Sequence, residues 1–211
     1  YNNRGVRKAK VGDYKGAIKD YSKAVRFNVV QPVVYYNRAI AKSKSGDIQG
    51  ALDDYNLAIQ YNPYYYNAIM NRGATTYQLG RYTESISDYN DAVELDPSKY
   101  QAFYNRALAK DKTGDLNGSI SDFDKVVEIN DKFSQAYYFR GTAKYNTEDY
   151  IDAIADYNIA IDLNSEYREA YTNRGTSRYE LGDSQGACLD WKKAASLGLR
   201  KAKEKYENYC K

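Results

Sequence analysis

Arginine and aspartate residues recur along the chain with a fixed spacing. The arginines follow one another at intervals of 34 residues, and each is followed sixteen residues later by an aspartate. A guanidinium and a carboxylate placed in register could bind a charged ligand, or they could pair with each other inside the protein. The arginines are Arg4, Arg38, Arg72, Arg106, Arg140 and Arg174, and the aspartates are Asp20, Asp54, Asp88, Asp122, Asp156 and Asp190.

The helical neighbours of these arginines favour a structural role. Each Arg shares a helical stripe with a large residue three positions earlier, as Arg38 does with Tyr35. Because that stripe faces the next helix, the guanidinium is expected to be partly buried and to need a partner. We therefore predict a ladder of ion pairs; pairing within one repeat and pairing between neighbours both remain open. Its central members are Arg38, Asp54, Arg72, Asp88, Arg106, Asp122, Arg140 and Asp156.

Other residues that could carry chemistry are scarce. The chain of 211 residues contains no histidine, and it shows neither a phosphate-binding loop nor a nucleophile beside a base. We expect no enzyme activity, no cofactor and no metal site. A net charge of +3 with interspersed signs argues against nucleic-acid binding. No apolar run approaches about 18 residues, which argues against membrane insertion.

The two cysteines stand on either side of a predicted helix end. Cys188 precedes Gly198 and Cys210 follows it at a similar distance, so antiparallel helices about that glycine would make a disulfide feasible. Two unrelated thiols are the alternative. A disulfide would indicate a periplasmic or extracellular protein, and free thiols a cytoplasmic one.

The elements that position these residues are helices. Apolar and small residues recur at spacings of three and four in two stretches per repeat, separated by a turn that usually contains glycine. In the fifth repeat Glu148 occupies the glycine position, where we expect a left-handed backbone. The first helices of the repeats, the A helices, are expected at 1–11, 33–45, 67–79, 101–113, 135–147 and 169–181. The second helices, the B helices, are expected at 14–27, 48–61, 82–95, 116–129, 150–163 and 184–197.

The period, the small residues, the Gly turn and the Tyr-x-x-Ala steps resemble the tetratricopeptide repeat (TPR) family. The resemblance implies an all-α solenoid, a right-handed superhelix of helical hairpins with a concave groove lined by the A helices. We predict one solenoid domain over 1–211. Its repeats are 1–31, 32–65, 66–99, 100–133, 134–167 and 168–198, with a cap helix at 199–210. The first repeat lacks its opening residues, so we expect the protein to continue upstream or that end to meet another surface.

Two further series mark the candidate groove. An asparagine precedes most of the arginines, and in the TPR family this position often holds the backbone of a bound peptide. The stripe at minus two, plus two and plus five from each Arg is rich in tyrosine and varies between repeats. The alternatives are hydrogen bonds within the stack for the asparagines and packing between repeats for the rings. The candidate residues are Tyr36, Asn37, Asn71, Tyr77, Tyr104, Asn105, Tyr138, Phe139, Tyr145, Asn173 and Tyr179.

These residues favour a non-catalytic scaffold that binds a peptide or protein segment in the concave groove. The stripe carries no lysine at minus two and no asparagine at plus two, which argues against the clamp that some TPR domains use for acidic C-terminal tails. We therefore expect a more apolar, tyrosine-rich ligand. The alternative is a self-association module that forms a homo-oligomer through the solenoid ends or the convex face.

Overall fold

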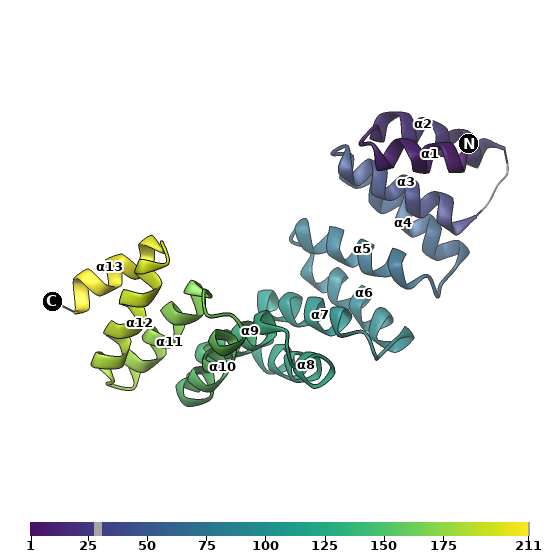
Figure 1. Ribbon diagram of the computed structural model, residues 1–211. Helices are drawn as coiled ribbons and strands as arrows, with labels where there is room; N and C mark the ends of the chain where they lie inside the picture. The colour runs from purple at the N-terminus through teal and green to yellow at the C-terminus, as the bar shows by residue number, and fades with distance from the viewer. Residues whose placement is uncertain (28–30, 211) are drawn as a thin grey trace. The chain divides into compact units, whose positions relative to one another are not determined.

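The computed structural model describes residues 1–27 and 31–210, and within them it contains thirteen helices and no strand (Figure 1). Every observed helix boundary lies within one residue of the sequence-based expectation. The A helices are α1 (Asn2–Lys10), α3 (Pro32–Lys44), α5 (Tyr66–Gln78), α7 (Tyr100–Thr113), α9 (Ser134–Asn146) and α11 (Arg168–Glu180). The B helices are α2 (Tyr14–Arg26), α4 (Ile48–Tyr61), α6 (Tyr82–Leu95), α8 (Leu116–Ile129), α10 (Tyr150–Leu163) and α12 (Ser184–Ser196), and the cap helix is α13 (Arg200–Tyr209).

The helices form two compact units, Tyr1–Pro97 and Ser98–Lys211, which are described separately. In each unit every A helix packs against the B helix that follows it, and that B helix packs against the next A helix. The cap helix packs on α12. This arrangement confirms the expected fold of stacked helical hairpins, while the single-domain assignment and the superhelix hand stay predictions.

Each hairpin is closed by one aromatic ring of its B helix. These rings are almost fully buried, and each B helix also buries a small residue one turn earlier. In the last repeat a Cβ atom on Gly175 would lie 2.9 Å from the Trp191 ring nitrogen, so only glycine permits this approach. The rings are Tyr21, Tyr55, Tyr89, Phe123, Tyr157 and Trp191.

The turn between the two helices of a repeat requires a left-handed residue. Glu148 has a φ of 64°, the one non-glycine residue with positive φ in the described chain, which confirms the expected strain at this position. The residue that follows caps the B helix in five of the six repeats. Its carboxylate accepts a hydrogen bond from a backbone N–H three residues later, at Asp13, Asp47, Asp115, Asp149 and Asp183. The third repeat has Arg81 there and makes no side-chain cap.

Candidate functional site

The structure pairs each ladder arginine with the aspartate of its own repeat. In the second repeat Arg38 Nε donates to Asp54 Oδ2 at 2.8 Å, and Nη2 donates to Oδ1 at 2.6 Å. The same two-point contact recurs in the other repeats, and it spans sixteen residues each time. The six aspartates are buried. The question left open by the sequence therefore has a clear geometric answer, pairing within the repeat.

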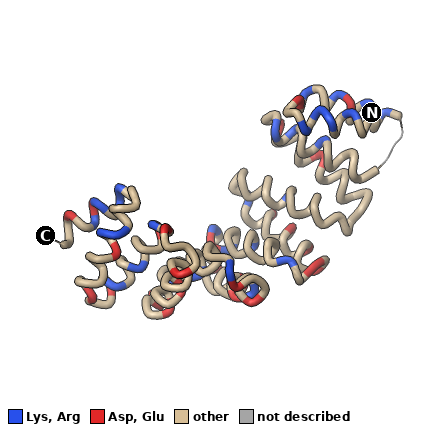
Figure 2. Tube along the Cα trace, viewed as in Figure 1, with Lys and Arg blue, Asp and Glu red and all other residues tan. Residues whose placement is uncertain are grey.

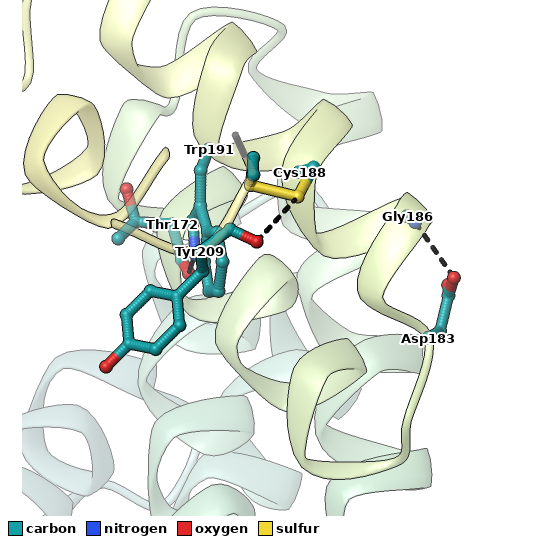
Figure 3. The surroundings of a disulfide bond; sticks show 7 residues. Thr172, Asp183, Gly186, Cys188, Trp191 and Tyr209 are labelled. Atoms are coloured by element: carbon teal, nitrogen blue, oxygen red, sulfur yellow. Dashed lines mark hydrogen bonds between the residues drawn. A yellow bond between two sulfur atoms is a disulfide. The ribbon is translucent and has the colours of Figure 1, made fainter. Parts of the chain in front are cut away.

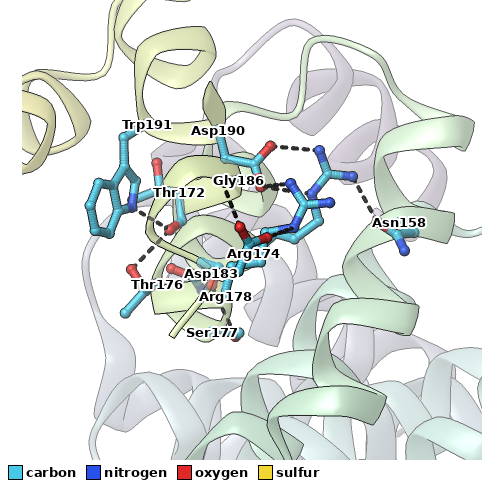
Figure 4. A network of polar contacts seen from close by, with 11 residues as sticks. Asn158, Thr172, Arg174, Thr176, Ser177, Arg178, Asp183, Gly186, Asp190 and Trp191 are labelled. Atoms are coloured by element: carbon cyan, nitrogen blue, oxygen red, sulfur yellow. Dashed lines mark hydrogen bonds and ion pairs between the residues drawn. The ribbon is translucent and has the colours of Figure 1, made fainter. Parts of the chain in front are cut away.

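The remaining guanidinium nitrogen of several arginines reaches the preceding repeat. Arg174 Nη1 donates to Asn158 on α10 at 2.7 Å, as Figure 4 shows. Equivalent contacts join Arg38 to Ser22, Arg72 to Asn56 and Arg140 to Asp124. One side chain thus holds its own hairpin together and also fastens it to a neighbour. These contacts support an internal role for the ladder.

A second series of cations, which the sequence analysis missed, completes the ladder. Four residues after most of the arginines stands a lysine whose ammonium lies 2.8 to 3.0 Å from the same aspartate. The series is Lys8, Lys42, Lys110 and Lys144, followed by Arg178 at 2.7 Å in the sixth repeat. Its period equals that of the arginines, so the signal was present in the sequence. The third repeat breaks the series with Thr76.

This substitution leaves Asp88 with a single cation. Arg72 is the one charged residue of α5, a helix that is drawn almost entirely in the tan of uncharged residues in Figure 2. Burial raises the pKa of the Asp88 carboxyl, and the contacts with Arg72 only partly offset that effect. In the first repeat the opposite holds, because hydrogen bonds from Arg4 and then Lys8 lower the pKa of Asp20. A cavity of about 280 Å³ opens beside Asp88, with Thr76 in its wall.

In the first unit, the predicted groove residues of neighbouring repeats touch one another. The Tyr36 ring lies 5.0 Å from the Tyr65 ring, and its hydroxyl accepts a hydrogen bond from Asn71 Nδ2 at 3.2 Å. Tyr77 packs edge-on against Tyr82 at 5.2 Å. Asn37 is half-buried at the equivalent position of α3.

The second unit repeats this pattern around Tyr138. Its ring lies 4.8 Å from that of Tyr167, and its hydroxyl accepts a hydrogen bond from Asn173 Nδ2 at 3.3 Å. In the preceding repeat Tyr104 lies 5.0 Å from Phe133 and 6.1 Å from Phe139.

Phe139, where the asparagine series is interrupted, thus joins an aromatic cluster. It stacks on Phe123 at 6.2 Å. Asn105 is half-buried one residue after Tyr104. Tyr145 packs against Tyr150 at 5.3 Å.

The aromatic residues just before three of the A helices contact the candidate groove tyrosines, and the sequence analysis did not single them out. Tyr65, Phe133 and Tyr167 are the N-cap residues of α5, α9 and α11, and each meets the tyrosine at minus two of the repeat before. Their period would have revealed them, although Lys99 interrupts it. These pairs fix the rings in half-buried positions, and contact with a ligand as well stays a prediction.

Each unit has a cavity between consecutive A helices at the same repeat positions. In the second unit a cavity of about 300 Å³ lies between α9 and α11, with Asn173 in its wall. In the first unit a cavity of about 200 Å³ lies between α3 and α5, with Asn71 in its wall. Counted from the ladder arginine of each repeat, both cavities are lined by the residues at positions plus two, plus five and plus six of one repeat. The next repeat contributes its residues at minus one and plus two. These residues are Thr142, Tyr145, Asn146, Asn173 and Thr176 in one case and Ile40, Ser43, Lys44, Asn71 and Ala74 in the other.

The cap helix is fastened to the last repeat by a disulfide. Cys188 on α12 is bonded to Cys210, which follows α13, with a Cα–Cα distance of 5.7 Å. Figure 3 shows Trp191 and Tyr209 beside this bond. Their ring centroids are 5.8 Å apart, and Tyr179, which is 39% exposed, lies 5.2 Å from Tyr209. Tyr179 and the two cysteines were singled out from the sequence, whereas Trp191 and Tyr209 were not among the candidate site residues.

Residues 1–27 and 31–210 contain no group of three or more His, Cys, Asp or Glu side chains that could hold a metal ion. None of the helices in this part of the chain combines the length and the apolar character needed to cross a bilayer.

Comparisons with known proteins agree on one family. Residues 73–114 match a TPR repeat, and residues 32–65, 100–133 and 138–196 match tetratricopeptide repeats. No curated protein matches the sequence.

Three solved structures illustrate the shared fold. The C-terminal part of a TPR repeat-containing protein from Cytophaga hutchinsonii has a TM-score of 0.81 at 17% identity, covering 93% of this chain and 79% of that chain. YrrB, described as a TPR protein with an unusual peptide-binding site, has a TM-score of 0.77 at 17% identity, with 89% and 97% covered. MamA from Desulfovibrio magneticus RS-1 has a TM-score of 0.74 at 20% identity, with 79% and 94% covered. At these identities the likeness concerns the fold alone.

Proposed function

Because this chain belongs to the tetratricopeptide repeat family, we propose that it is a non-catalytic scaffold that binds an extended segment of a protein partner across its A helices. The single observation that carries the proposal is the recurrence of a cavity between consecutive A helices at the same repeat positions in both units. A ligand that crosses two consecutive A helices of either unit would meet the same kind of opening. An extended peptide is such a ligand, because its side chains point alternately to opposite sides and can enter an opening of this kind.

The polar groups in these cavities suit a peptide backbone. Asn173 Nδ2 donates to the Tyr138 hydroxyl, which orients the amide. Its Oδ1 accepts no hydrogen bond from the described residues and is available to a peptide N–H. Burial, followed by the negative charge of Glu169, raises the pKa of Tyr138, so the phenol that orients this amide stays protonated at neutral pH. Asn71 and Tyr36 repeat this arrangement in the first unit.

The family and one similar structure support a binding role. TPR repeat proteins are in general scaffolds, and the YrrB structure is described by its peptide-binding site.

The disulfide supports a proposal about location. Because disulfides persist in oxidising compartments, we propose that this scaffold acts in a periplasm or outside the cell.

A displayed library of random peptides tests the proposal without knowledge of the partner. Peptides enriched on the wild-type chain should lose affinity for Thr176→Trp, because a large ring at this position fills the cavity between α9 and α11. Ile151→Trp is the matched control, since Ile151 is 71% exposed on α10 and lies outside the cavity. We expect a loss of at least roughly tenfold for the first variant and none for the control.

Two results would count against this function. One is a library that yields no enriched peptide, and the other is unchanged binding of all enriched peptides to Thr176→Trp. Self-association is the alternative to peptide binding. Light scattering over a range of protein concentrations should show a constant mass, and a mass that grows with concentration would favour assembly.

A further inference from the structure

The cavity between α9 and α11 is bordered by two lysines of the cap helix. Lys201 and Lys205 lie one helical turn apart on α13 and line the cavity together with Thr142, Asn173 and Thr176. The equivalent cavity of the first unit has Lys44 in its wall, from an A helix, but no pair of this kind. The C-terminal cavity therefore combines the groove surface with a cationic wall.

The cap helix holds this wall in place. The Cys188–Cys210 bond ties the end of α13 to α12. The Lys205 ammonium lies 5.3 Å from the centre of the Trp191 ring, which is itself buried in the last hairpin. Stacking against an aromatic face directs a lysine without neutralising its charge.

No ion pair within residues 1–27 and 31–210 balances the charges of the two lysines. Burial and then the charge of Lys201 lower the pKa of Lys205, and Glu180 acts weakly in the opposite direction. Neither lysine forms an ion pair with a described residue, whereas Lys42 and Lys144 each lie beside a ladder aspartate. Two neighbouring cations at the edge of a cavity attract an anion, and a carboxylate fits the six N–H donors that they offer.

The threonines and the asparagine present the complementary half. Thr142 and Thr176 donate their hydroxyl hydrogens to carbonyls of their own helices, both at 2.9 Å. The Thr142 oxygen also accepts hydrogen bonds from the Tyr157 hydroxyl and from Asn173 Nδ2. The Thr176 oxygen and Asn173 Oδ1 therefore face a ligand as acceptors. The cavity thus has hydrogen-bond acceptors on α11 and cationic donors on the cap helix.

We propose that this cavity accepts a carboxylate of the bound peptide, held by Lys201 and Lys205, while peptide N–H groups meet the acceptors on α11. The inference rests on the proposed function and specifies its ligand. The partner segment would be apolar and rich in tyrosine along most of its length, and it would carry a negative charge where it reaches the cap helix. The carboxylate can come from the C-terminus of the segment or from an acidic side chain.

Four forms of one short peptide separate these sources. The probes are acetyl-Ala-Tyr-Ala-Glu and acetyl-Ala-Tyr-Ala-Gln, each with a free or an amidated C-terminus. The chain has a single tryptophan. A carboxylate that draws Lys205 from the Trp191 ring should change the indole emission, so fluorescence titration reports on the cavity directly. Binding by the free-acid Gln peptide indicates a C-terminal carboxylate, and binding by the amidated Glu peptide indicates a side chain.

The decisive comparison uses neutral variants of equal length. Lys201→Gln/Lys205→Gln should weaken binding of the carboxylate peptides by at least roughly tenfold, because it removes two charge-assisted contacts. Lys203→Gln is the matched control, as Lys203 lies on the same helix but outside the cavity. Circular dichroism should show equal helix content in all three proteins.

The inference is overturned if no carboxylate form produces a saturable change, or if the double variant binds as well as the wild type. Equal affinity for the uncharged peptide would also overturn it. None of these results bears on peptide binding across the A helices, because Thr176→Trp and the displayed library test that proposal separately. A library that enriches only uncharged peptides would thus preserve the proposed function and reject the carboxylate site.

Discussion

Restoring the missing cation of the third repeat should stabilise the protein. The change is Thr76→Lys, which places an ammonium where four other repeats have one at 2.8 to 3.0 Å from the ladder aspartate. The cavity of about 280 Å³ between Thr76 and its surroundings leaves room for the longer side chain. The hydroxyl that is lost bonds only to carbonyls of its own helix, those of Arg72 and Gly73.

The expected gain is the difference between two larger quantities. A hydrogen bond to a charged group contributes about 1.5–3 kcal/mol, and lysine has a helix propensity a few tenths of a kcal/mol better than threonine. Ordering the lysine side chain costs about 1.5–2 kcal/mol. The same contact would lower the raised pKa of Asp88, so the pKa change reports this gain and is not added to it. We expect the free energy of unfolding to rise by about 1 kcal/mol at pH 7.

The pH dependence gives the prediction its sharpest test. A raised native pKa means that the folded wild type binds the Asp88 proton more tightly than the unfolded chain does, so this residue stabilises the fold less as pH rises through its native pKa. Thr76→Lys removes that loss. Its advantage over the wild type should therefore be small near the unfolded Asp pKa of about 3.9 and grow as pH rises above it.

Urea denaturation of the wild type, Thr76→Lys and Thr76→Met from acid to neutral pH provides the measurement. Methionine has a similar length without the charge, so it should fill the space and show no pH-dependent gain. The reasoning is refuted if Met stabilises as much as Lys at pH 7, or if the gain from Lys is equally large in acid.

Three other substitutions follow from the same structure. Arg72→Met should lower the free energy of unfolding by about 3–5 kcal/mol, because Asp88 is left without a cation. Urea denaturation should show a smaller loss for Arg38→Met, because the aspartate of that repeat retains a lysine. Equal losses for the two variants would contradict this reasoning. Arg81→Asn should raise the free energy of unfolding by about 1 kcal/mol, because the asparagine side chain can cap α6. An equal gain from Arg81→Ala would contradict this explanation. Glu148→Gly should raise the melting temperature through a gain on the order of 1 kcal/mol, because glycine tolerates the left-handed backbone; a lower melting temperature would contradict that reasoning.

The repeat made most of the fold predictable from the sequence. Six copies of one pattern average out the local ambiguities that usually blur helix ends, so boundaries such as those of α4 and α10 match the expectation. The position of Glu148 was also readable, because a glycine column with one exception identifies both the backbone geometry and the residue that violates it.

The candidate site was less predictable, because it depends on contacts between repeats. The Asn71 contact with Tyr36 joins residues 35 positions apart, and a pattern aligned within one repeat does not show it. The lysines of the cap helix were missed for a different reason. Lys201 and Lys205 lie outside the repeat and meet the groove only because α13 folds back beside it.

The confinement of each Arg–Asp pair to one hairpin bears on how such a chain can change in length. Duplication or loss of a whole 34-residue segment leaves every arginine sixteen residues ahead of an aspartate. No such event leaves a buried aspartate without its arginine, so repeats can be added or removed without the energetic cost of an unpaired buried charge. The contact to the preceding hairpin is more tolerant, because serine, asparagine and aspartate all serve as acceptors there. Ancestral gain of repeats would thus have needed no compensating substitution in the ladder.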